Sequence, residues 1–229
     1  MKLRNILYTA ALIASCQRKD ENYQTSADKP ADNGDGGAGG AFDCERGAPV
    51  RDGSVAHYPV DGDTCKEAAN NLREPYAGET ECNLKVNYSG SFATAAPADT
   101  REKCCTASIS GVVNNTYATV LLPHWGGCDP CFDQFYSNLV AHEQGHVDYC
   151  NEAGRDLENR VRNIPPKTKC VDINDATTPC DLAWQDVEDE FNTIFDEVSD
   201  DLSQKNEKYD NDTNHGETQG ATLNCNCDH

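Results

Sequence analysis

The sequence predicts an α+β fold in which a small antiparallel sheet precedes two long helices, and disulfides stabilise the whole domain. Three observations support this prediction. Alternating β-branched segments occur between residues 57 and 122, and helical apolar spacing begins near residue 132 and again after residue 180. The chain of 229 residues also contains thirteen cysteines but one methionine, which is typical of an oxidising compartment.

The first half of the chain carries the strand signals. We expect strands over residues 57–60, 84–88, 108–113 and 117–122, where apolar and polar residues alternate. The pair Asn114-Asn115 separates the last two of these strands and predicts a hairpin. Thr64 is a suitable N-cap for a short helix that extends to Leu72.

Two long helices follow. The first is expected to start at Asp129-Pro130 and to run to about Asn163, before a pair of prolines. The second is expected to follow Cys180, with Asp181 as its cap. Its predicted buried stripe consists of Val187, Phe191, Ile194, Phe195, Val198 and Leu202. The opposite face of this helix is densely acidic, which is usual for a solvated surface.

The N-terminus resembles the signal of a bacterial lipoprotein. Residues 1–15 combine a basic start with an apolar core that is too short to span a bilayer, and Cys16 follows two small residues. We expect cleavage after residue 15, lipidation of Cys16, a flexible tether over 16–41 and a folded domain over 42–229. The alternative is an ordinary cleaved signal with a chance cysteine. Gln17, which is not Asp, favours the outer membrane or the cell surface of the envelope.

The net charge limits the classes of partner. Asp and Glu number 39 against 19 Lys and Arg, so the formal charge is −20. Nucleic acids and anionic membrane surfaces repel such a chain, so we expect no nucleic-acid partner and contact with the membrane through the lipid alone. The oligomeric state is not predictable from these residues.

The cysteines predict disulfides. Setting Cys16 aside leaves 13 − 1 = 12 cysteines, enough for six disulfides whose pairing the sequence does not define. Cys128-x-x-Cys131 also fits a zinc site or a redox pair, but the chain has no second C-x-x-C motif. We therefore favour disulfides over a structural metal at these cysteines.

The first long helix contains His142-Glu143-Gln144-Gly145-His146. Histidines four residues apart lie on one helix face, about 6 Å apart along the axis, so both imidazoles can reach one Zn²⁺. Glu143 is then placed to accept a proton from water as a general base. This is the H-E-x-x-H signature of zinc metallopeptidases. The alternative is a pair of surface histidines beside an unrelated glutamate.

A catalytic zinc needs a third protein ligand and an open position. Cys150 lies one further turn along the same helix, too far to share the ion, so we assign it to a disulfide. His215 follows the second helix, which an antiparallel return would bring back to the first, and it is our choice among the remaining histidines. A glutamate of the second helix, such as Glu188 or Glu190, is the competitor.

Two further roles are predicted near this helix. Asp148 or Glu152, which follow the motif on the same helix, could orient an imidazole by hydrogen bonding. The other histidines that precede the motif, His57 and His124, are each placed in or at the end of a predicted strand.

Three blocks of the chain resemble a bacterial family of predicted secreted zinc-dependent proteases, catalogued as a domain of unknown function. These blocks are LLPHW, FxxFYxxLxxHExxHxxxC and YDxxTxHGxTQGA, and the match would cover most of residues 55 to 223. The resemblance implies that His215 is a functional residue. Tyr209, in the same block, could stabilise an oxyanion through its hydroxyl or could simply pack at a helix end. This chain departs from the family in its cysteine content and its long acidic helix.

Together these features predict a lipid-anchored, extracytoplasmic zinc-dependent peptidase with a protein or peptide substrate. The expected metal ligands are His142, His146 and His215, and the expected catalytic residues are Glu143 and Tyr209. The alternative is a non-catalytic envelope lipoprotein that binds a partner, with a structural metal or none. A cysteine-rich zinc module is a third reading, and it would require reduced thiols.

Overall fold

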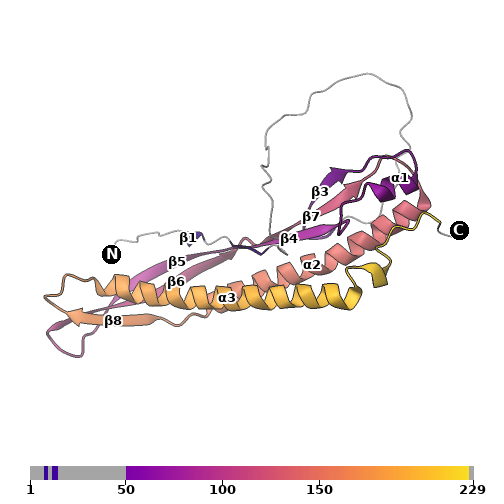
Figure 1. The fold of residues 1–229 in the computed structure, drawn as a ribbon. Coiled ribbons are helices and arrows are strands. Elements are labelled where there is room, and N and C mark those ends of the chain that lie inside the picture. The colour runs from indigo at the N-terminus through magenta and orange to yellow at the C-terminus, as the bar shows by residue number, and fades with distance from the viewer. Residues whose placement is uncertain (1–7, 10–11, 15–49, 227–229) are drawn as a thin grey trace, which may run out of the picture.

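The computed structural model describes residues 8–9, 12–14 and 50–226, and it confirms the α+β prediction. Two helices, α2 (Pro130–Arg162) and α3 (Pro179–Thr213), run antiparallel along an elongated layer of strands (Figure 1). The shorter helical elements are α1 (Cys65–Asn70) and the 3₁₀ helix η1 (Glu217–Gln219). The strands are β1 (Tyr8–Thr9), β2 (Leu12–Ala14), β3 (Ser54–Pro59), β4 (Glu79–Leu84), β5 (Val86–Ala95), β6 (Glu102–Asn114), β7 (Tyr117–His124) and β8 (Lys167–Asp172).

The described strands form two sheets. One has the order β1-β5-β6-β8 and is antiparallel throughout. The other has the order β2-β4-β7-β3, and in it β3 runs parallel to β7. The strand predicted over residues 84–88 is in fact divided between the two sheets, because the chain leaves β4 and enters β5 at Lys85.

The predicted hairpin at Asn114-Asn115 is wrong. β6 pairs with β5 and β8, whereas β7 pairs with β4 and β3, so the two strands belong to different sheets. The backbone N–H of Asn115 donates to the Lys85 carbonyl over 2.7 Å, and that of Thr116 donates to Asn114 Oδ1 over 2.8 Å. These bonds hold a crossover between sheets where a tight turn was expected.

Local capping signals set the helix starts. The Asp129 carboxylate accepts from the backbone N–H groups of the first turn of α2, as expected, and Thr64 caps α1 through a capping box with Glu67. The second helix starts earlier than predicted: Thr178, and not Asp181, is its N-cap residue, and Pro179 is its first residue. Asp181 lies in the first turn and accepts a hydrogen bond from the Thr178 hydroxyl.

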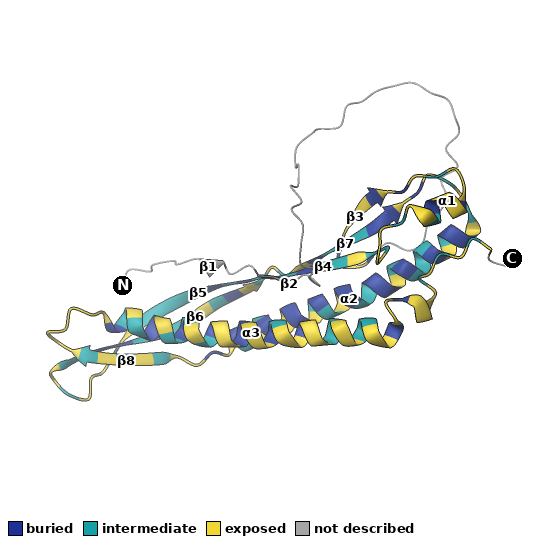
Figure 2. Ribbon diagram, viewed as in Figure 1, coloured by how far each residue is buried: buried dark blue, intermediate teal, exposed yellow. Residues whose placement is uncertain are grey.

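The two long helices bury one face each against the sheets and against one another, and they leave the other face exposed (Figure 2). All six residues predicted as the buried stripe of α3 are buried. On α2 the stripe continues from Phe132 through Leu139 and Val147 to Leu157. Because His142, Glu143 and His146 belong to this same stripe, the polar motif faces the interior of the fold.

Two of the described disulfides join the long helices to the sheets, Cys82–Cys150 from β4 to α2 and Cys105–Cys180 from β6 to α3. The described pairs are Cys65–Cys225, Cys82–Cys150, Cys104–Cys170 and Cys105–Cys180. Cys128 and Cys131 are disulfide-bonded as well, so neither offers the thiolate that a zinc site or a reduced redox pair would need. These ten account for all but Cys44 and Cys227 of the twelve, and those two lie outside the described residues.

Apart from its two short strands, β1 and β2, the expected leader over residues 1–15 lies outside the described residues, as do Cys16 and the expected tether. Within the part of the chain that the structure describes, no helix combines the length and apolar character needed to cross a bilayer.

Candidate metal centre

Both histidines of the H-E-x-x-H motif lie inside the fold. The exposed fraction is 4% for His142 and 9% for His146. Their ring centroids are 5.0 Å apart and the ring planes are almost perpendicular, at 88°. One turn of α2 therefore presents two imidazoles to the same small volume, as the spacing predicts.

Two side-chain amides orient these imidazoles. Nδ1 of His142 lies 3.0 Å from Gln219 Oε1 and Nδ1 of His146 lies 2.9 Å from Asn206 Oδ1. Because an amide oxygen accepts and never donates, each Nδ1 must carry a proton, so Nε2 is the nitrogen of each ring that can bind a metal, once it carries no proton of its own. Asn206 lies on α3 and Gln219 on η1, so both are supplied by the C-terminal part of the chain.

The predicted orienting role of Asp148 and Glu152 is wrong. Asp148 accepts from the Gln144 side chain, and Glu152 accepts from Lys205 at the surface. Successive positions on a helix are separated by about 100°, so neither carboxylate shares the buried face on which the histidines lie.

Asp210 completes a group that the sequence did not identify. Its Oδ1 lies 2.9 Å from His146 Nε2 and 3.4 Å from His142 Nε2. Ligands held tetrahedrally at ~2.0–2.1 Å from zinc are about 3.3 Å from one another, so the donor atoms already have the spacing of a metal site. Of the described residues, His142, His146 and Asp210 form one of two groups of this kind. The second group includes Cys104 and Cys170, whose sulfurs are bonded to each other.

Mutual electrostatics favour the ionised form of Asp210 and the protonated form of His146 in the metal-free chain. Burial raises the pKa of Asp210, but hydrogen bonds from the two imidazoles outweigh it and bring that pKa well below its usual value. Burial lowers the pKa of His146, but bonds with Asp210 and Asn206 outweigh it and leave the pKa raised. The site therefore holds a carboxylate that stays ionised at neutral pH, which is the form that binds a cation.

His215 lies next to this group but outside it. It follows α3 directly, and its Nδ1 is 3.9 Å from Asp210 Oδ1. Its Nε2 is 3.1 Å from the Tyr76 hydroxyl, and the two rings stack with centroids 4.2 Å apart. The side chain is 38% exposed. The antiparallel return of α3 thus brings His215 to the site as expected, while Asp210 lies nearer to both imidazoles.

The competing glutamates lie elsewhere. Glu188 accepts from the Trp184 indole N–H, and Glu190 forms an ion pair with Lys167 of β8. The YDxxTxHG block folds tightly: the Thr213 hydroxyl donates to the Tyr209 carbonyl over 2.8 Å, and Gly216 takes a positive φ of 85°.

Glu143 faces strand β4. The side chain is 3% exposed, and its Oε2 accepts a hydrogen bond of 2.6 Å from the Thr80 hydroxyl. A Cβ at Gly78 would lie 2.5 Å from Glu143 Oε1, so glycine is the residue that leaves room for this carboxylate. Burial raises the pKa of Glu143, and the bond from Thr80 opposes that rise.

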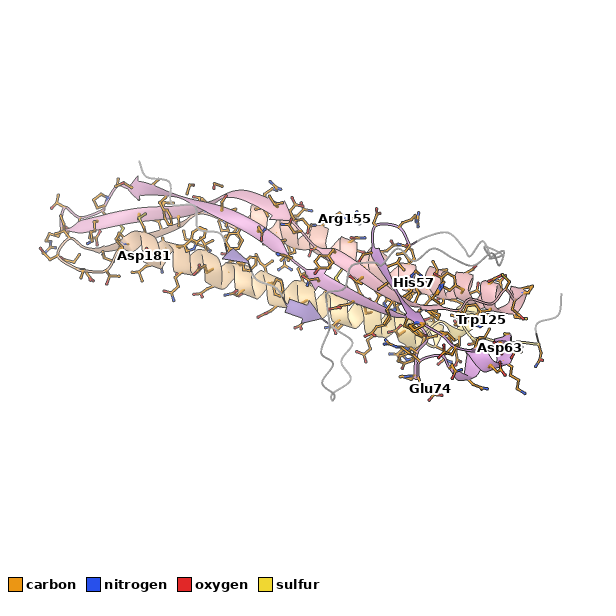
Figure 3. The ribbon with its side chains drawn as sticks, turned by 90° about the horizontal axis from the view of Figure 1, so that it is seen from above. His57, Asp63, Glu74, Trp125, Arg155 and Asp181 are labelled. Carbon is orange, nitrogen blue, oxygen red and sulfur yellow. A yellow bond between two sulfur atoms is a disulfide. The ribbon has the colours of Figure 1, made fainter. Side chains whose placement is uncertain are left out.

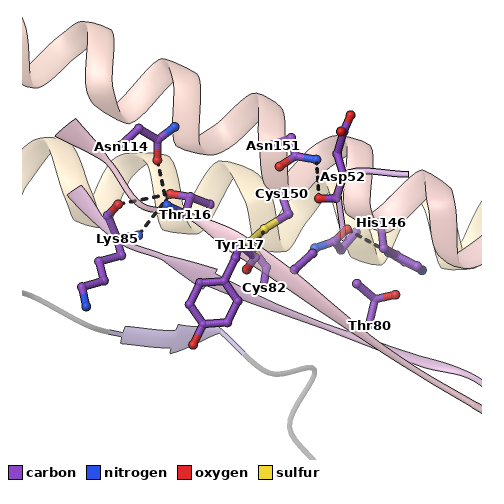
Figure 4. The surroundings of a disulfide bond; sticks show 12 residues. Asp52, Thr80, Cys82, Lys85, Asn114, Thr116, Tyr117, His146, Cys150 and Asn151 are labelled. Carbon is purple, nitrogen blue, oxygen red and sulfur yellow. Dashed lines mark hydrogen bonds between the residues drawn. A yellow bond between two sulfur atoms is a disulfide. The ribbon is translucent and has the colours of Figure 1, made fainter. Parts of the chain in front are cut away.

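A disulfide fixes β4 against the motif. Cys82 lies two residues beyond Thr80, and Cys150 lies one turn beyond His146 (Figure 4). Their bond joins β4 to α2 at the level of the site. The assignment of Cys150 to a disulfide is thereby confirmed.

Tyr209 packs against both histidines. Its ring stacks on His142 at 5.1 Å and 10°, and it meets His146 edge-on at 5.1 Å and 85°. The hydroxyl accepts from Gln219 Nε2 over 3.1 Å and lies 3.4 Å from the His142 carbonyl. A Cβ at Gly145 would lie 2.5 Å from Tyr209, so the motif's glycine allows this close approach. The ring therefore restricts the orientation of both imidazole planes.

The sequence missed Asp210, Asn206 and Gln219. On a helix, Asn206, Tyr209, Asp210 and Thr213 follow one another at intervals of three, one and three, which places them on one face. This shared face is the signal in the sequence that points to Asn206 and Asp210.

Comparison with known proteins gives one match. No curated protein and no solved structure matches this chain. A family described as a bacterial protein of unknown function (DUF922) matches residues 55–216, a span that contains both long helices, the H-E-x-x-H motif and Asp210. The chain therefore belongs to the DUF922 family of bacterial proteins.

Proposed function

We propose that this protein is a zinc-dependent peptidase that hydrolyses amide bonds in protein or peptide substrates. The observation that carries the proposal is the convergence of His142 Nε2, His146 Nε2 and Asp210 Oδ1, with Glu143 on the same helical turn. Two imidazoles and one carboxylate make a common ligand set of catalytic zinc, and three protein ligands leave a fourth position for water or substrate.

Zinc bound by these three residues would supply Lewis acidity, which acidifies water and polarises a carbonyl group. Glu143 would accept the proton of the attacking water and pass it to the leaving amine nitrogen as the C–N bond breaks. Burial raises its pKa, which suits a group that must both take up and release a proton near neutral pH. Thr80 holds the carboxylate in place for this exchange.

Asp210 is the better candidate for the third ligand. Its oxygen already lies at ligand spacing from both imidazoles, whereas His215 is bonded to Tyr76 and would have to leave that ring to approach. His215, the third ligand predicted from the sequence, is therefore the second choice for this role. Where it lies, it can hydrogen-bond Asp210 or a substrate group near the site.

The packing of Tyr209 against both imidazoles supports a positioning role. Its hydroxyl is directed toward the α2 backbone and Gln219, so an oxyanion contact, the predicted catalytic role, would require the ring to move. The proposed cellular location is the envelope: the disulfides fit an oxidising compartment, and the predicted lipid on Cys16 would supply the anchor.

The alternative is a non-catalytic lipoprotein in which the same polar residues stabilise the interior. It is supported by the completeness of the network without a metal, since each imidazole Nδ1, Glu143 and Asp210 has a hydrogen-bonding partner. Under this reading, zinc would be absent from the purified protein.

Zinc content and peptide hydrolysis separate the two readings. The full chain is purified, its zinc is measured by mass spectrometry, and cleavage of unfolded casein is followed. Glu143→Gln should retain zinc and lose hydrolysis, whereas Glu158→Gln, the same change at the surface of α2 beside Arg162, should retain both. Full hydrolysis by Glu143→Gln, or a zinc-free protein that stays zinc-free when supplied with the metal, would overturn the proposal.

A further inference from the structure

Two histidines that the candidate centre does not use lie together where β3, the edge strand of the β2-β4-β7-β3 sheet, pairs with β7. His57 is in β3, and His124 ends β7. In the parallel register of these strands, His57 pairs with Leu122 and Pro59 pairs with His124. Alternate residues of a strand point to the same face, so His57 and His124 project from the same face of the sheet. Both side chains are exposed.

The geometry of this pair resembles that of the motif histidines. The ring centroids of His57 and His124 are 5.8 Å apart and the planes are inclined by 65°, against 5.0 Å and 88° for His142 and His146. A third polar atom comes from α2, where the Tyr136 hydroxyl lies 3.2 Å from His57 Nε2. Three elements therefore bring two imidazoles and a phenol together. Figure 3 shows His57 on the ribbon of β3, at the same end of the molecule as Trp125, which follows His124.

This cluster is separate from the α2 centre. Tyr136 precedes His142 by six residues, which corresponds to about 9 Å along the helix axis. Neither His57 nor His124 contacts Asp210, Asn206 or Gln219 in the described hydrogen-bond network. Among the described residues, the fold thus divides the histidines outside the motif: His215 lies beside the α2 centre, and His57 lies beside His124.

The donor set indicates which ion would bind. Imidazole nitrogens suit Cu²⁺, Zn²⁺ and Ni²⁺, and for a given set of nitrogen and oxygen donors Cu²⁺ binds most tightly. The exposed position leaves room for water in the remaining places of a tetragonal Cu²⁺ ion. The strongly negative net charge of the protein, −20, raises the local concentration of any cation.

We propose that His57 and His124, with the Tyr136 hydroxyl as a third donor, form a surface site for a divalent transition-metal ion. Of these ions, Cu²⁺ should bind most tightly. This site would be a second metal site of the protein, independent of whether the α2 centre is catalytic.

Copper titration of the metal-free full chain tests the proposal, with electron paramagnetic resonance to count bound Cu²⁺ and its nitrogen ligands. His57→Asn and His124→Asn should each lose one equivalent of bound copper relative to the wild type. Both should leave zinc uptake at the α2 centre unchanged. Because both side chains are exposed, both variants should fold, and circular dichroism checks this.

A matched tyrosine pair tests the third donor. Tyr136→Phe should weaken copper binding at this site by about 10-fold, the lower end of the effect of removing a supporting group. Tyr117→Phe, which removes a hydroxyl from an exposed tyrosine of β7, should leave the affinity unchanged. The site is refuted if either histidine variant binds as many copper equivalents as the wild type with the same affinity. A site shared by the two histidines requires that His57→Asn and His124→Asn each lose the copper equivalent.

Discussion

Replacing Asn206 with alanine should weaken zinc binding without unfolding the protein. The Asn206 amide oxygen accepts the Nδ1 proton of His146 over 2.9 Å, and this bond selects the tautomer that leaves Nε2 available to the metal. Removing such a partner typically costs 10- to 100-fold in metal affinity, or about 1.4 to 2.7 kcal/mol. The loss of one partly buried hydrogen bond should cost the metal-free protein about 1 kcal/mol.

The assay is competition for zinc between the full chain and a chromogenic chelator. Asn206→Asp restores an acceptor and should restore most of the affinity, which a purely steric role would not predict. Lys208→Ala removes an exposed side chain of the same helix that pairs with Asp212, so it should have no effect on zinc. The reasoning is refuted if Asn206→Ala binds zinc as tightly as the wild type, or if Lys208→Ala weakens binding equally.

Three further predictions concern packing, covalent structure and pH. Gly145→Ala places a methyl group 2.5 Å from the Tyr209 ring; this overpacking should cost about 1–3 kcal/mol and lower zinc affinity, measured by chemical unfolding and the same competition assay. Removing the Cys82–Cys150 disulfide, which closes a loop of 68 residues, should cost about 4 kcal/mol in the free energy of unfolding, and a loss below about 1 kcal/mol would contradict that estimate. In the metal-free chain, the raised pKa of His146 gives stability that is lost as pH rises above about 6.5, and the lowered pKa of Asp210 gives stability that is lost as pH falls below about 4. Asp210→Asn should therefore destabilise the metal-free protein most between these values, and an equal effect at pH 9 would exclude the pair as the cause.

Local signals were sufficient for α1 and for the start of α2, whereas the start of α3 was predicted a few residues too late. Asp129 followed by Pro130 defines the start of α2 because the carboxylate satisfies free backbone N–H groups there, and these contacts involve neighbours in sequence. Thr64 and Glu67 specify α1 in the same way. The motif histidines needed nothing beyond helical periodicity to face the same volume.

Tertiary contacts decided what the sequence could not predict. The change of sheet at Asn115 depends on the Lys85 carbonyl, which is thirty residues away in the sequence and far outside a local pattern. Asp210 lies on a helix with many Asp and Glu residues, and the sequence alone does not distinguish them. Only the packing of α3 against α2 shows that Asp210 lies beside the motif histidines. Asn206 and Gln219 have no signature of their own, because an amide becomes an orienting group through the imidazole that it meets.

The coordination sphere of the zinc-loaded full chain tests the central claim most directly, by crystallography or X-ray absorption. We predict one zinc ion bound by Nε2 of His142, Nε2 of His146 and a carboxylate oxygen of Asp210, with a fourth position open to solvent. If the imidazole of His215 binds the zinc in place of the Asp210 carboxylate, our assignment of the third ligand is wrong. Zinc bound away from His142 and His146, or no zinc between these two rings, would contradict the account.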